Sequence, residues 1–369
     1  MDVILEFADA YVFDKFWATV LPAQTAIAQH NATATFSSMR EGATLIPQKQ
    51  WTWEPATQYF SFPPSEYAWM SSWSRDKTER QFIELFLIVW LFGVLLYFIC
   101  ATLSYVFVFD KTTFQHPKYL KNQLWMEIKQ AQTSMPGMSL LTAVCFVLEV
   151  KGYAKFYDRL DEAPFPLYNY LQFPIFILFT DCLIYFIHRG LHHPMVYKTL
   201  HKPHHKWIMP TPFASHAFHP LDGFAQSVPY HLFPFIFPLQ KFAYIALFGF
   251  INIWTIFIHD GEYVANSPVI NGAACHTMHH LYFSKYTLLC FTGTLLLTLV
   301  DYNYGQFTTL WDRLGGSYRK PNEELFRRET KMAAAEWNRQ AKEMEKIQQE
   351  VEGEDDRQYS GLAEVKKVQ

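Results

Sequence analysis

The sequence has few charged residues and no large excess of either sign. Charged side chains make up 18% of the 369 residues, and the formal net charge is −3. An average soluble domain carries about 25% charged residues, so the composition favours a membrane protein. No basic patch with a groove-reading motif is present, which argues against a nucleic-acid partner.

Cysteine chemistry and a cleaved leader are also not expected. Five cysteines are scattered, mostly within apolar runs, and none forms a CxxC pair: Cys100, Cys145, Cys182, Cys275 and Cys290. We interpret them as buried thiols that pack as small hydrophobic groups. The N-terminal segment has no basic region and contains four acidic residues, Asp2, Glu6, Asp9 and Asp14, so we expect no cleaved signal peptide.

Long apolar runs dominate the middle of the chain. Half of the residues are hydrophobic and 18% are aromatic. Residues 83–109 contain Glu84 near the start and then no charge, and a helix that rises about 1.5 Å per residue is long enough there to cross a hydrocarbon core of about 30 Å. Two further apolar runs, at about 137–153 and 166–187, predict a second and a third pass.

Two later apolar runs are of different kinds. Residues 228–258 are broken by Pro234, Pro238 and Gly249 and are long enough for a hairpin of two short helices. The run at 287–300 is too short to span a bilayer, so we expect it to be buried or interfacial.

Positive charges orient the predicted passes. Lysines at 111–129 and the basic residues of 189–206 are separated by two crossings, so both groups can face the cytosol. This parity places residues 1–80 in the lumen, where the sequon at Asn31 is usable, and the C-terminus in the cytosol, where Lys366-Lys-Val-Gln369 resembles a dilysine signal for endoplasmic-reticulum retrieval. In the alternative topology, the first apolar run is itself a hairpin and the N-terminus is cytosolic.

These patterns divide the chain into three parts. Residues 1–80 form an N-terminal extension, residues 81–320 a membrane-embedded domain, and residues 321–369 a charged cytosolic tail in which Glu, Lys, Arg and Gln dominate. We predict no catalytic role for the tail.

Nine of the fifteen histidines lie in three tight clusters. The clusters read HRGLHH at 188–193, HKPHH at 201–205 and HTMHH at 276–280, and their histidines are His188, His192, His193, His201, His204, His205, His276, His279 and His280. Residues three and four apart share a helical face, and neutral imidazole is a common ligand for iron, zinc and copper. Nine nitrogens are too many for one tetrahedral zinc, so the sequence predicts two metal ions bound by these nine residues, which we also take as the catalytic set.

Local sequence refines the clusters. Gly190 weakens the first helix slightly. Pro203 is tolerated in a first helical turn, so we expect His204 and His205 to begin a helix and His201 to lie on the turn before it. His259, at the end of the predicted hairpin, is a tenth candidate ligand.

Other polar residues near the clusters are weaker candidates. His216 and His219 could be ligands or face a substrate. Asp181 lies two helical turns before His188, so it either supports a ligand through a hydrogen bond or caps a buried polar network. Asp222, Asp260 and Glu262 are comparable candidates.

The motifs that are missing narrow the chemistry. HExxH, typical of zinc hydrolases, is absent, and so are the Glu-x-x-His pairs of soluble di-iron carboxylate proteins. A membrane-embedded, aromatic-rich scaffold favours oxidation of a lipid C–H bond, which requires a redox metal, oxygen and an external source of electrons.

The three boxes resemble those of the fatty acid hydroxylase/sterol desaturase superfamily. More narrowly, residues 188–193, 201–207, 212–223 and 307–319 resemble the fungal C-5 sterol desaturase (lathosterol oxidase-like) branch. The resemblance implies an all-α integral membrane protein, a multi-pass helical bundle with a cytosolic, histidine-rich di-metal cap, in the endoplasmic reticulum membrane. It also implies introduction of a 5,6 double bond into a Δ7-sterol in ergosterol biosynthesis.

The resemblance implies the cofactors and partners as well. Two iron ions and O2 would act with electrons from NADH or NADPH, delivered by cytochrome b5 and its reductase, and zinc can replace iron in isolated protein. The His-Pro-Gly-Gly haem motif is absent, so the electron donor is expected to be a separate chain. Membrane lipids surround the protein, and no nucleic acid is expected.

Two alternatives remain. A sterol C4-methyl oxidase or a lipid hydroxylase of the same superfamily would use the same metal centre. A membrane sensor or scaffold with a zinc-filled site would not be an enzyme, and a missing box histidine would support it; all nine are present.

Overall fold

The structure is a computed structural model that describes residues 1–23, 51–260, 267–281, 285–291, 294–300 and 302–321, together with a few single positions nearer the C-terminus. For residues 285–291 and 294–300 it describes the backbone only. The chain divides into two compact units. The first contains Met1–Leu91, Ser139–Pro166 and Phe235–Ile245, and the second contains Phe92–Met138, Leu167–Pro234 and Ala246–Gln369.

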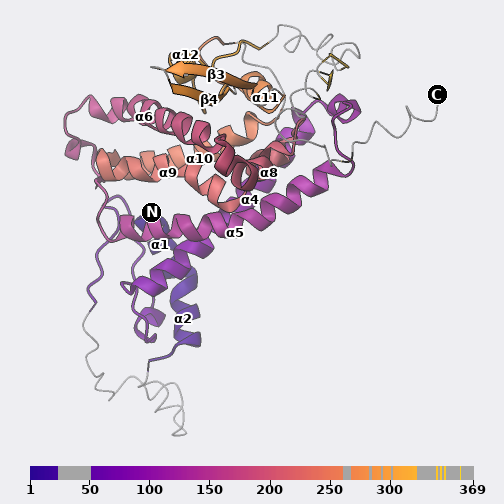
Figure 1. Ribbon diagram of the computed structural model, residues 1–369. Helices are drawn as coiled ribbons and strands as arrows, with labels where there is room; N and C mark the ends of the chain where they lie inside the picture. The colour runs from indigo at the N-terminus through magenta and orange to yellow at the C-terminus, as the bar shows by residue number, and fades with distance from the viewer. Residues whose placement is uncertain are drawn as a thin grey trace, which may run out of the picture. The chain divides into compact units, whose positions relative to one another are not determined.

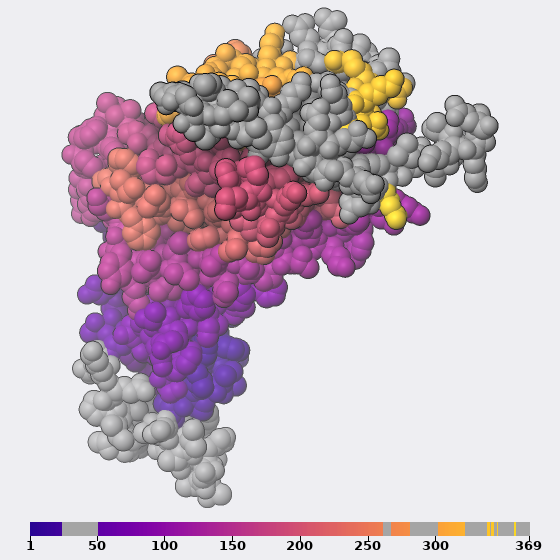
Figure 2. Space-filling view, in the orientation of Figure 1, coloured from indigo at the N-terminus to yellow at the C-terminus, as the bar shows by residue number. Residues whose placement is uncertain are grey.

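Three helices in the described residues are long and apolar enough to cross a membrane (Figure 1). They are α4 (Thr78–Phe107), α5 (Gln123–Val150) and α6 (Tyr168–Leu191). Each overlaps most of one predicted pass, so the prediction of a multi-pass helical membrane protein is confirmed. Figure 2 shows one face of the same chain in a space-filling view.

Helix α5 begins well before the apolar run that predicted it. Its first half is polar, and Pro136 lies inside the helix. Glu127 in this half is fully buried and accepts hydrogen bonds from the backbone N–H and the hydroxyl of Thr211 and from Gln123. Hydropathy alone missed these residues because their polar groups are satisfied by a distant loop and not by water.

The predicted helical hairpin is also confirmed. It consists of α9 (Pro220–Ile236) and α10 (Lys241–Phe257). Between them, the short strand β2 (Leu239–Gln240) pairs in parallel with β1 (Phe156–Tyr157) in the first unit. Helix α9 begins before the apolar run, at a proline, which suits the start of a helix because its missing N–H would have no partner there.

Residues 285–291 and 294–300 are strands. β3 (Lys285–Phe291) and β4 (Thr294–Val300) pair antiparallel, with Lys285 opposite Val300. Threonine, leucine and aromatic residues suit a pleated strand, and each arm is too short to span a bilayer. The run at 287–300 was expected to be buried or interfacial. Its side chains lie outside the described ones, so this stays a prediction.

The N-terminal residues fold within the first unit as α1 (Asp2–Ala8), η1 (Asp9–Phe13) and α2 (Asp14–Val20), followed by η3 (Glu66–Trp69). A buried ionic network joins them to the start of α4. Asp14 pairs with Arg75 at 2.6 Å and with Arg80 at 2.9 Å, and Arg80 also pairs with Asp9 and, at 2.8 Å, with Glu84. The charge of Glu84 is therefore paired, which explains how a carboxylate is tolerated near the start of an apolar helix.

The remaining helical turns are short. They are η4 (Lys111–Gln115), η5 (Leu160–Glu162), α7 (Pro194–Val196), η6 (Tyr197–His201), α8 (Lys202–His205), η7 (Pro212–His216), α11 (Ala273–Leu281) and α12 (Leu310–Leu314). Among the cysteines whose side chains the structure describes, all four are free thiols. Cys275 is buried, whereas Cys100, Cys145 and Cys182 are only half-buried, so the prediction of burial was too broad.

Several predictions concern residues outside the described ones. These are the sequon at Asn31, the carboxylate of Glu262 and the dilysine-like end of the chain. The three predicted parts, 1–80, 81–320 and 321–369, stay predictions, and most of the tail lies outside the described residues.

Candidate metal centre

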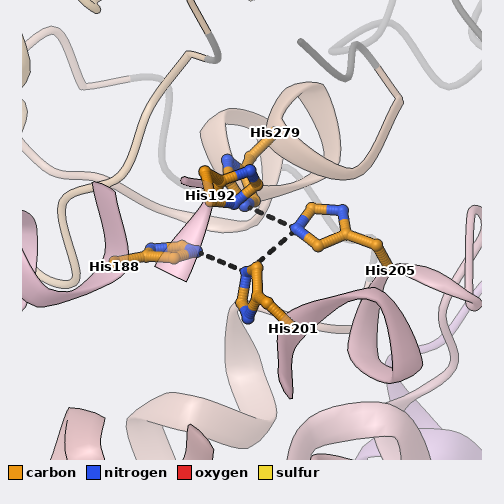
Figure 3. A group of neighbouring side chains, drawn as sticks. All are labelled: His188, His192, His201, His205 and His279. Atoms are coloured by element: carbon orange, nitrogen blue, oxygen red, sulfur yellow. Dashed lines mark hydrogen bonds between the residues drawn. The ribbon is translucent and has the colours of Figure 1, made fainter. Parts of the chain in front are cut away.

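Nine buried histidines of the second unit form two groups that could each hold a metal ion. Within each group, one ligand atom per residue lies within 4.8 Å of all the others. The first group contains His188, His192, His201, His205 and His279, and the second contains His204, His259, His276 and His280. Figure 3 shows the five imidazoles of the first group pointing toward one another.

The first box lies where α6 ends. His188 is in the last turn of the helix and His192 is its C-cap residue, so residues four apart place two imidazoles on one face, as predicted. His193 differs. It is exposed, it precedes α7, and its Nδ1 accepts a hydrogen bond from the Met195 N–H at 3.4 Å.

The structure therefore does not bring His193 together with the other eight box histidines, and its role as a ligand stays a prediction. The chain leaves the helix at His192, and the next residue has extended backbone angles, which turn its side chain away from the helical face. His193 belongs to neither group, and we leave it out of the proposed ligands and catalytic residues.

The second box is a turn followed by a helix, as Pro203 predicted. His201 is the last residue of the π-helical turn η6, and α8 begins at Lys202 with Pro203 in its first turn. His201 and His205 join the first group, whereas His204 joins the second. Adjacent helical residues point about 100° apart, so this box supplies both groups.

The third box occupies α11 and also supplies both groups. His276 and His280, four apart on one face, belong to the second group, and His279 belongs to the first. His259, just after α10, completes the second group, and its Nε2 lies 3.0 Å from Nε2 of His276.

Backbone carbonyls fix the orientation of several rings. Nδ1 of His188 donates to the Tyr304 carbonyl at 3.0 Å, and Nδ1 of His279 donates to the Tyr302 carbonyl at 2.8 Å. In the second group, Nδ1 of His259 donates to the Thr255 carbonyl at 2.7 Å. A neutral imidazole that donates through Nδ1 presents a lone pair at Nε2.

These lone pairs face one another. Nε2 of His201 lies 3.1 Å from Nε2 of His188 and 3.1 Å from Nε2 of His205, and Nε2 of His279 lies 3.1 Å from Nε2 of His205 (Figure 3). Two facing lone pairs repel at this distance unless a proton or a metal cation lies between them. For His188 and His201, whose Nδ1 atoms lie 3.0 Å from the Tyr304 carbonyl and 2.8 Å from the Asp222 carboxylate, the arrangement favours a cation between the two Nε2 atoms.

Burial disfavours the proton. Burial lowers the pKa of His259 to about 4. It also lowers, well below the ordinary value, the pKa of five box histidines outside the membrane-spanning helices: His204, His205, His276, His279 and His280. Neighbouring imidazoles lower these pKa values further. Uncharged histidines with converging lone pairs suit a metal ion such as iron, zinc or copper.

Two carboxylates predicted near the site have different partners. Asp222 lies 2.8 Å from Nδ1 of His201, and both side chains are fully buried, so Asp222 supports a box histidine. Asp181 instead accepts hydrogen bonds from the backbone N–H groups of residues 306–308, which is the buried polar network that was the other interpretation of this residue.

Three further candidates lie in neither group. His216 is hydrogen-bonded to Ser215 and Asn252, at 3.1 and 3.4 Å, and His219 accepts from the Leu221 N–H at 3.3 Å. Asp260 is buried but is not a member of either group.

Sequence reasoning missed two backbone carbonyls that accept hydrogen bonds from box histidines, and the aspartate that holds one of these residues in place. The carbonyls of Tyr302 and Tyr304 hold box histidines, and Asp312 binds the backbone N–H of Tyr304. A carbonyl has no sequence signature. Asp312 does lie in the segment 307–319 that carried the family resemblance, and this was the one available signal.

Comparison with known proteins defines the class first. The family model described as "Fatty acid hydroxylase" matches residues 173–317, which contain all three histidine boxes. The chain is 62% identical over 367 residues to a Delta(7)-sterol 5(6)-desaturase of Aspergillus fumigatus, covering 100% of this chain and 99% of that protein. It is 59% identical to the Delta(7)-sterol 5(6)-desaturase of Leptosphaeria maculans, with 100% of both chains covered, and 47% identical to that of Candida albicans, with 97% and 99% covered.

The chain therefore belongs to the fungal Delta(7)-sterol 5(6)-desaturase family of oxidoreductases. No solved structure matches it. The predicted resemblance to the fungal C-5 sterol desaturases is confirmed.

Proposed function

We propose that this chain introduces the 5,6 double bond into a Δ7-sterol during ergosterol biosynthesis. The observation that carries the proposal is the pair of buried histidine groups in a chain whose relatives are named Delta(7)-sterol 5(6)-desaturases. Three helices that are long and apolar enough to cross a membrane also support the proposal, because a sterol dissolves in the lipid phase.

We further propose that the two groups hold two iron ions. The five histidines of the first group would bind one ion and the four of the second group the other. Bound iron would supply the redox chemistry of the reaction. O2, two electrons and two protons would combine with the two hydrogens lost by the sterol, and two water molecules would form. The electrons would come from NADH or NADPH through cytochrome b5 and its reductase.

The role of the protein's own residues is to hold, orient and cover. Asp222 and the carbonyls of residues 302 and 304 keep the Nδ1 protons of three box histidines in place, so that each Nε2 stays available to a metal. Aromatic rings cover the imidazoles: Phe218 stacks on His204, with ring centroids 4.3 Å apart, and Tyr197 on His192 at 5.5 Å. This burial excludes water from a strong oxidant.

Location follows from the predicted topology. We propose that the protein resides in the endoplasmic reticulum membrane, with residues 1–80 in the lumen and the metal centre and charged tail in the cytosol. The support is the distribution of lysine and arginine between the passes. A cytosolic metal centre would also be accessible to a separate electron donor.

Complementation tests the activity. Expression in a yeast strain that lacks its own C-5 sterol desaturase should restore ergosterol, measured in the sterol profile by gas chromatography and mass spectrometry. Persistence of the 5,6-saturated sterol, with the protein present in the membrane fraction, would contradict the proposal. Accumulation of a hydroxylated sterol or an oxidised 4-methyl sterol would instead support the hydroxylase or C4-methyl oxidase alternatives.

Two variants connect the activity to the two groups. His279→Ala removes a first-group residue and His204→Ala a second-group residue, and each should abolish ergosterol formation while the protein stays in the membrane. Metal analysis of the purified chain should give about two ions, as iron or as zinc substituted for it. A chain that retains two zinc ions and has no oxidase activity after iron loading would favour the sensor or scaffold alternative.

A further inference from the structure

A short backbone segment holds two histidines of the first group. We call residues 302–305, between β4 and α12, the carbonyl shelf. Its carbonyls at positions 302 and 304 accept the Nδ1 protons of His279 and His188. These histidines come from different boxes, one on α11 and one on α6, so a single segment aligns two ligand-bearing helices.

Asp312 fixes the shelf from one side. Its Oδ1 accepts from the Tyr304 N–H and from the Ser317 hydroxyl, both at 2.8 Å, and its Oδ2 accepts from the Gly305 N–H at 2.8 Å. The side chain is fully buried. Because the Tyr304 carbonyl and the Gly305 N–H belong to one planar peptide group, the hydrogen bond from Gly305 to this carboxylate fixes the direction of the carbonyl that holds His188.

Asp181 fixes the chain immediately after the shelf. Its Oδ1 accepts from the N–H groups of Gln306 and Phe307 at 2.9 and 2.8 Å, and its Oδ2 accepts from the Thr308 N–H at 3.1 Å and the Thr308 hydroxyl at 2.6 Å. Asp181 and His188 lie on the same face of α6, two turns apart. One helix therefore carries a ligand and also anchors the segment that orients this ligand.

The shelf is also fixed by local conformation. Asn303 has a φ of 58°, a left-handed conformation that asparagine tolerates better than most residues. Its Nδ2 donates to the Cys275 carbonyl at 3.2 Å, next to the third box, and its Oδ1 accepts from the Arg319 N–H at 3.0 Å. A Cβ at Gly305 would lie 2.4 Å from the Thr308 carbonyl oxygen, so this position requires glycine.

We propose that Asp312 and Asp181 are positioning residues for the first histidine group. They hold the carbonyl shelf so that it accepts the Nδ1 protons of His188 and His279 and leaves both Nε2 atoms directed at one metal. The second group has its own backbone acceptor, the Thr255 carbonyl on α10 that holds His259. Loosening the shelf should therefore release one metal and leave the other. This inference rests on the proposed di-metal function.

Asp312→Asn tests the inference most directly. Asparagine keeps one acceptor oxygen but turns an N–H₂ group toward a backbone N–H, so the shelf loses one of its hydrogen bonds. In the purified full-length protein, we expect metal content to fall from about two ions per chain to about one after dialysis against a chelator, with first-site binding weakened about 10- to 100-fold. Asp181→Asn should act in the same direction through residues 306–308.

A combination of variants identifies the site that is lost. His259→Ala removes a second-group residue and should also leave about one ion per chain. If Asp312→Asn affects the other group, the double variant should retain about none; if both changes affect the same group, the double variant should keep about one and the inference is wrong. Asp158→Asn is the matched control, because Asp158 accepts from the Gln58 N–H in the first unit, and it should retain two ions.

A milder variant tests the same contact with a smaller risk of misfolding. Ser317→Ala removes the hydroxyl that contacts Asp312 and Tyr185 but leaves the Asp312 carboxylate in place, and it should weaken retention of one ion in a folded protein. Loss of both ions in Ser317→Ala, or two retained ions in either aspartate variant, would overturn the inference. A parent chain that binds fewer than two ions would contradict the di-metal proposal itself, which is a separate outcome.

Discussion

His201 and Asp222 form a fully buried pair, with Nδ1 of the imidazole 2.8 Å from a carboxylate oxygen. Asp222 lies in the first turn of α9, and its other oxygen accepts from Gln226 at 2.8 Å. The carboxylate keeps a proton on Nδ1 and leaves Nε2 of His201 for a metal. His201 Nε2 lies close to Nε2 of two other first-group histidines, so Asp222 acts at the middle of this group.

We predict that Asp222→Ala weakens metal binding about 10- to 100-fold, the usual cost of removing a partner of a ligating histidine. Asp222→Asn should have a smaller effect, because its amide oxygen can still accept the Nδ1 proton. Metal retention against a graded series of chelator concentrations measures both. Gln226→Ala is the control, since it removes only the outer hydrogen bond. Parent-like retention in Asp222→Ala would contradict the prediction.

Adjacent histidines give a matched pair of variants. His192 is buried in the first group, whereas His193 is exposed and belongs to neither. We predict that His192→Ala abolishes desaturation in the yeast assay and lowers the metal content. His193→Ala should keep both close to those of the parent. Loss of metal in His193→Ala, with the protein still folded, would restore this residue to the ligand set.

Two glycines should respond in opposite ways to alanine. A Cβ at Gly315 would lie 1.8 Å from the Tyr185 hydroxyl, which is hydrogen-bonded to Ser317, whereas a Cβ at Gly190 meets nothing within 4 Å. We expect Gly315→Ala to destabilise the protein by about 1–3 kcal/mol. Gly190→Ala should stabilise it by about 0.5–1 kcal/mol, because alanine favours the helix. Thermal unfolding of both variants in one detergent measures the difference, and equal midpoints would refute it.

The pH dependence of stability should include a term from His216. Burial lowers the pKa of His216 to about 4, below the value of about 6.5 in an unfolded chain. Between these values the unfolded chain binds the proton and the folded chain does not, so stability is complete above pH 6.5 and falls as the pH falls. We expect a loss of about 1–2 kcal/mol at pH 5, discounted because the ring is not fully buried.

His216→Asn should remove the part of the stability loss at acid pH that is due to His216, and it should leave the rest of that loss unchanged. Asparagine keeps a polar group near Ser215 and Asn252 but does not titrate. The measurement is the difference in unfolding midpoint between pH 7.5 and pH 5, compared with the parent. An unchanged difference would show that His216 does not contribute.

Much of the fold was predictable because hydropathy and helical spacing are local properties. The three passes, the hairpin of α9 and α10, and the turn at Pro203 all follow from residues near one another in the sequence. The strands at 285–291 and 294–300 and the early start of α5 were not predictable in this way. The buried Glu127 is satisfied by Thr211, a partner that lies far away in the sequence.

The site shows the same division. Spacing within the boxes predicted which histidines share a face, but the assignment to two groups depends on how α6, α8 and α11 pack. His193 lies outside both groups because α6 ends before it, and the spacing within the box does not show where this helix ends. The contacts of Asp312 were missed because its main partners are peptide groups, which every residue has.

The carbonyl shelf has a consequence for protein engineering and for comparison among relatives. Because the main chain at position 302 accepts the proton of His279, this hydrogen bond requires no particular side chain there. Variation at position 302 among relatives would therefore not indicate loss of metal binding. A change of metal preference in this family could instead arise at Asp181 or Asp312, neither of which belongs to either histidine group.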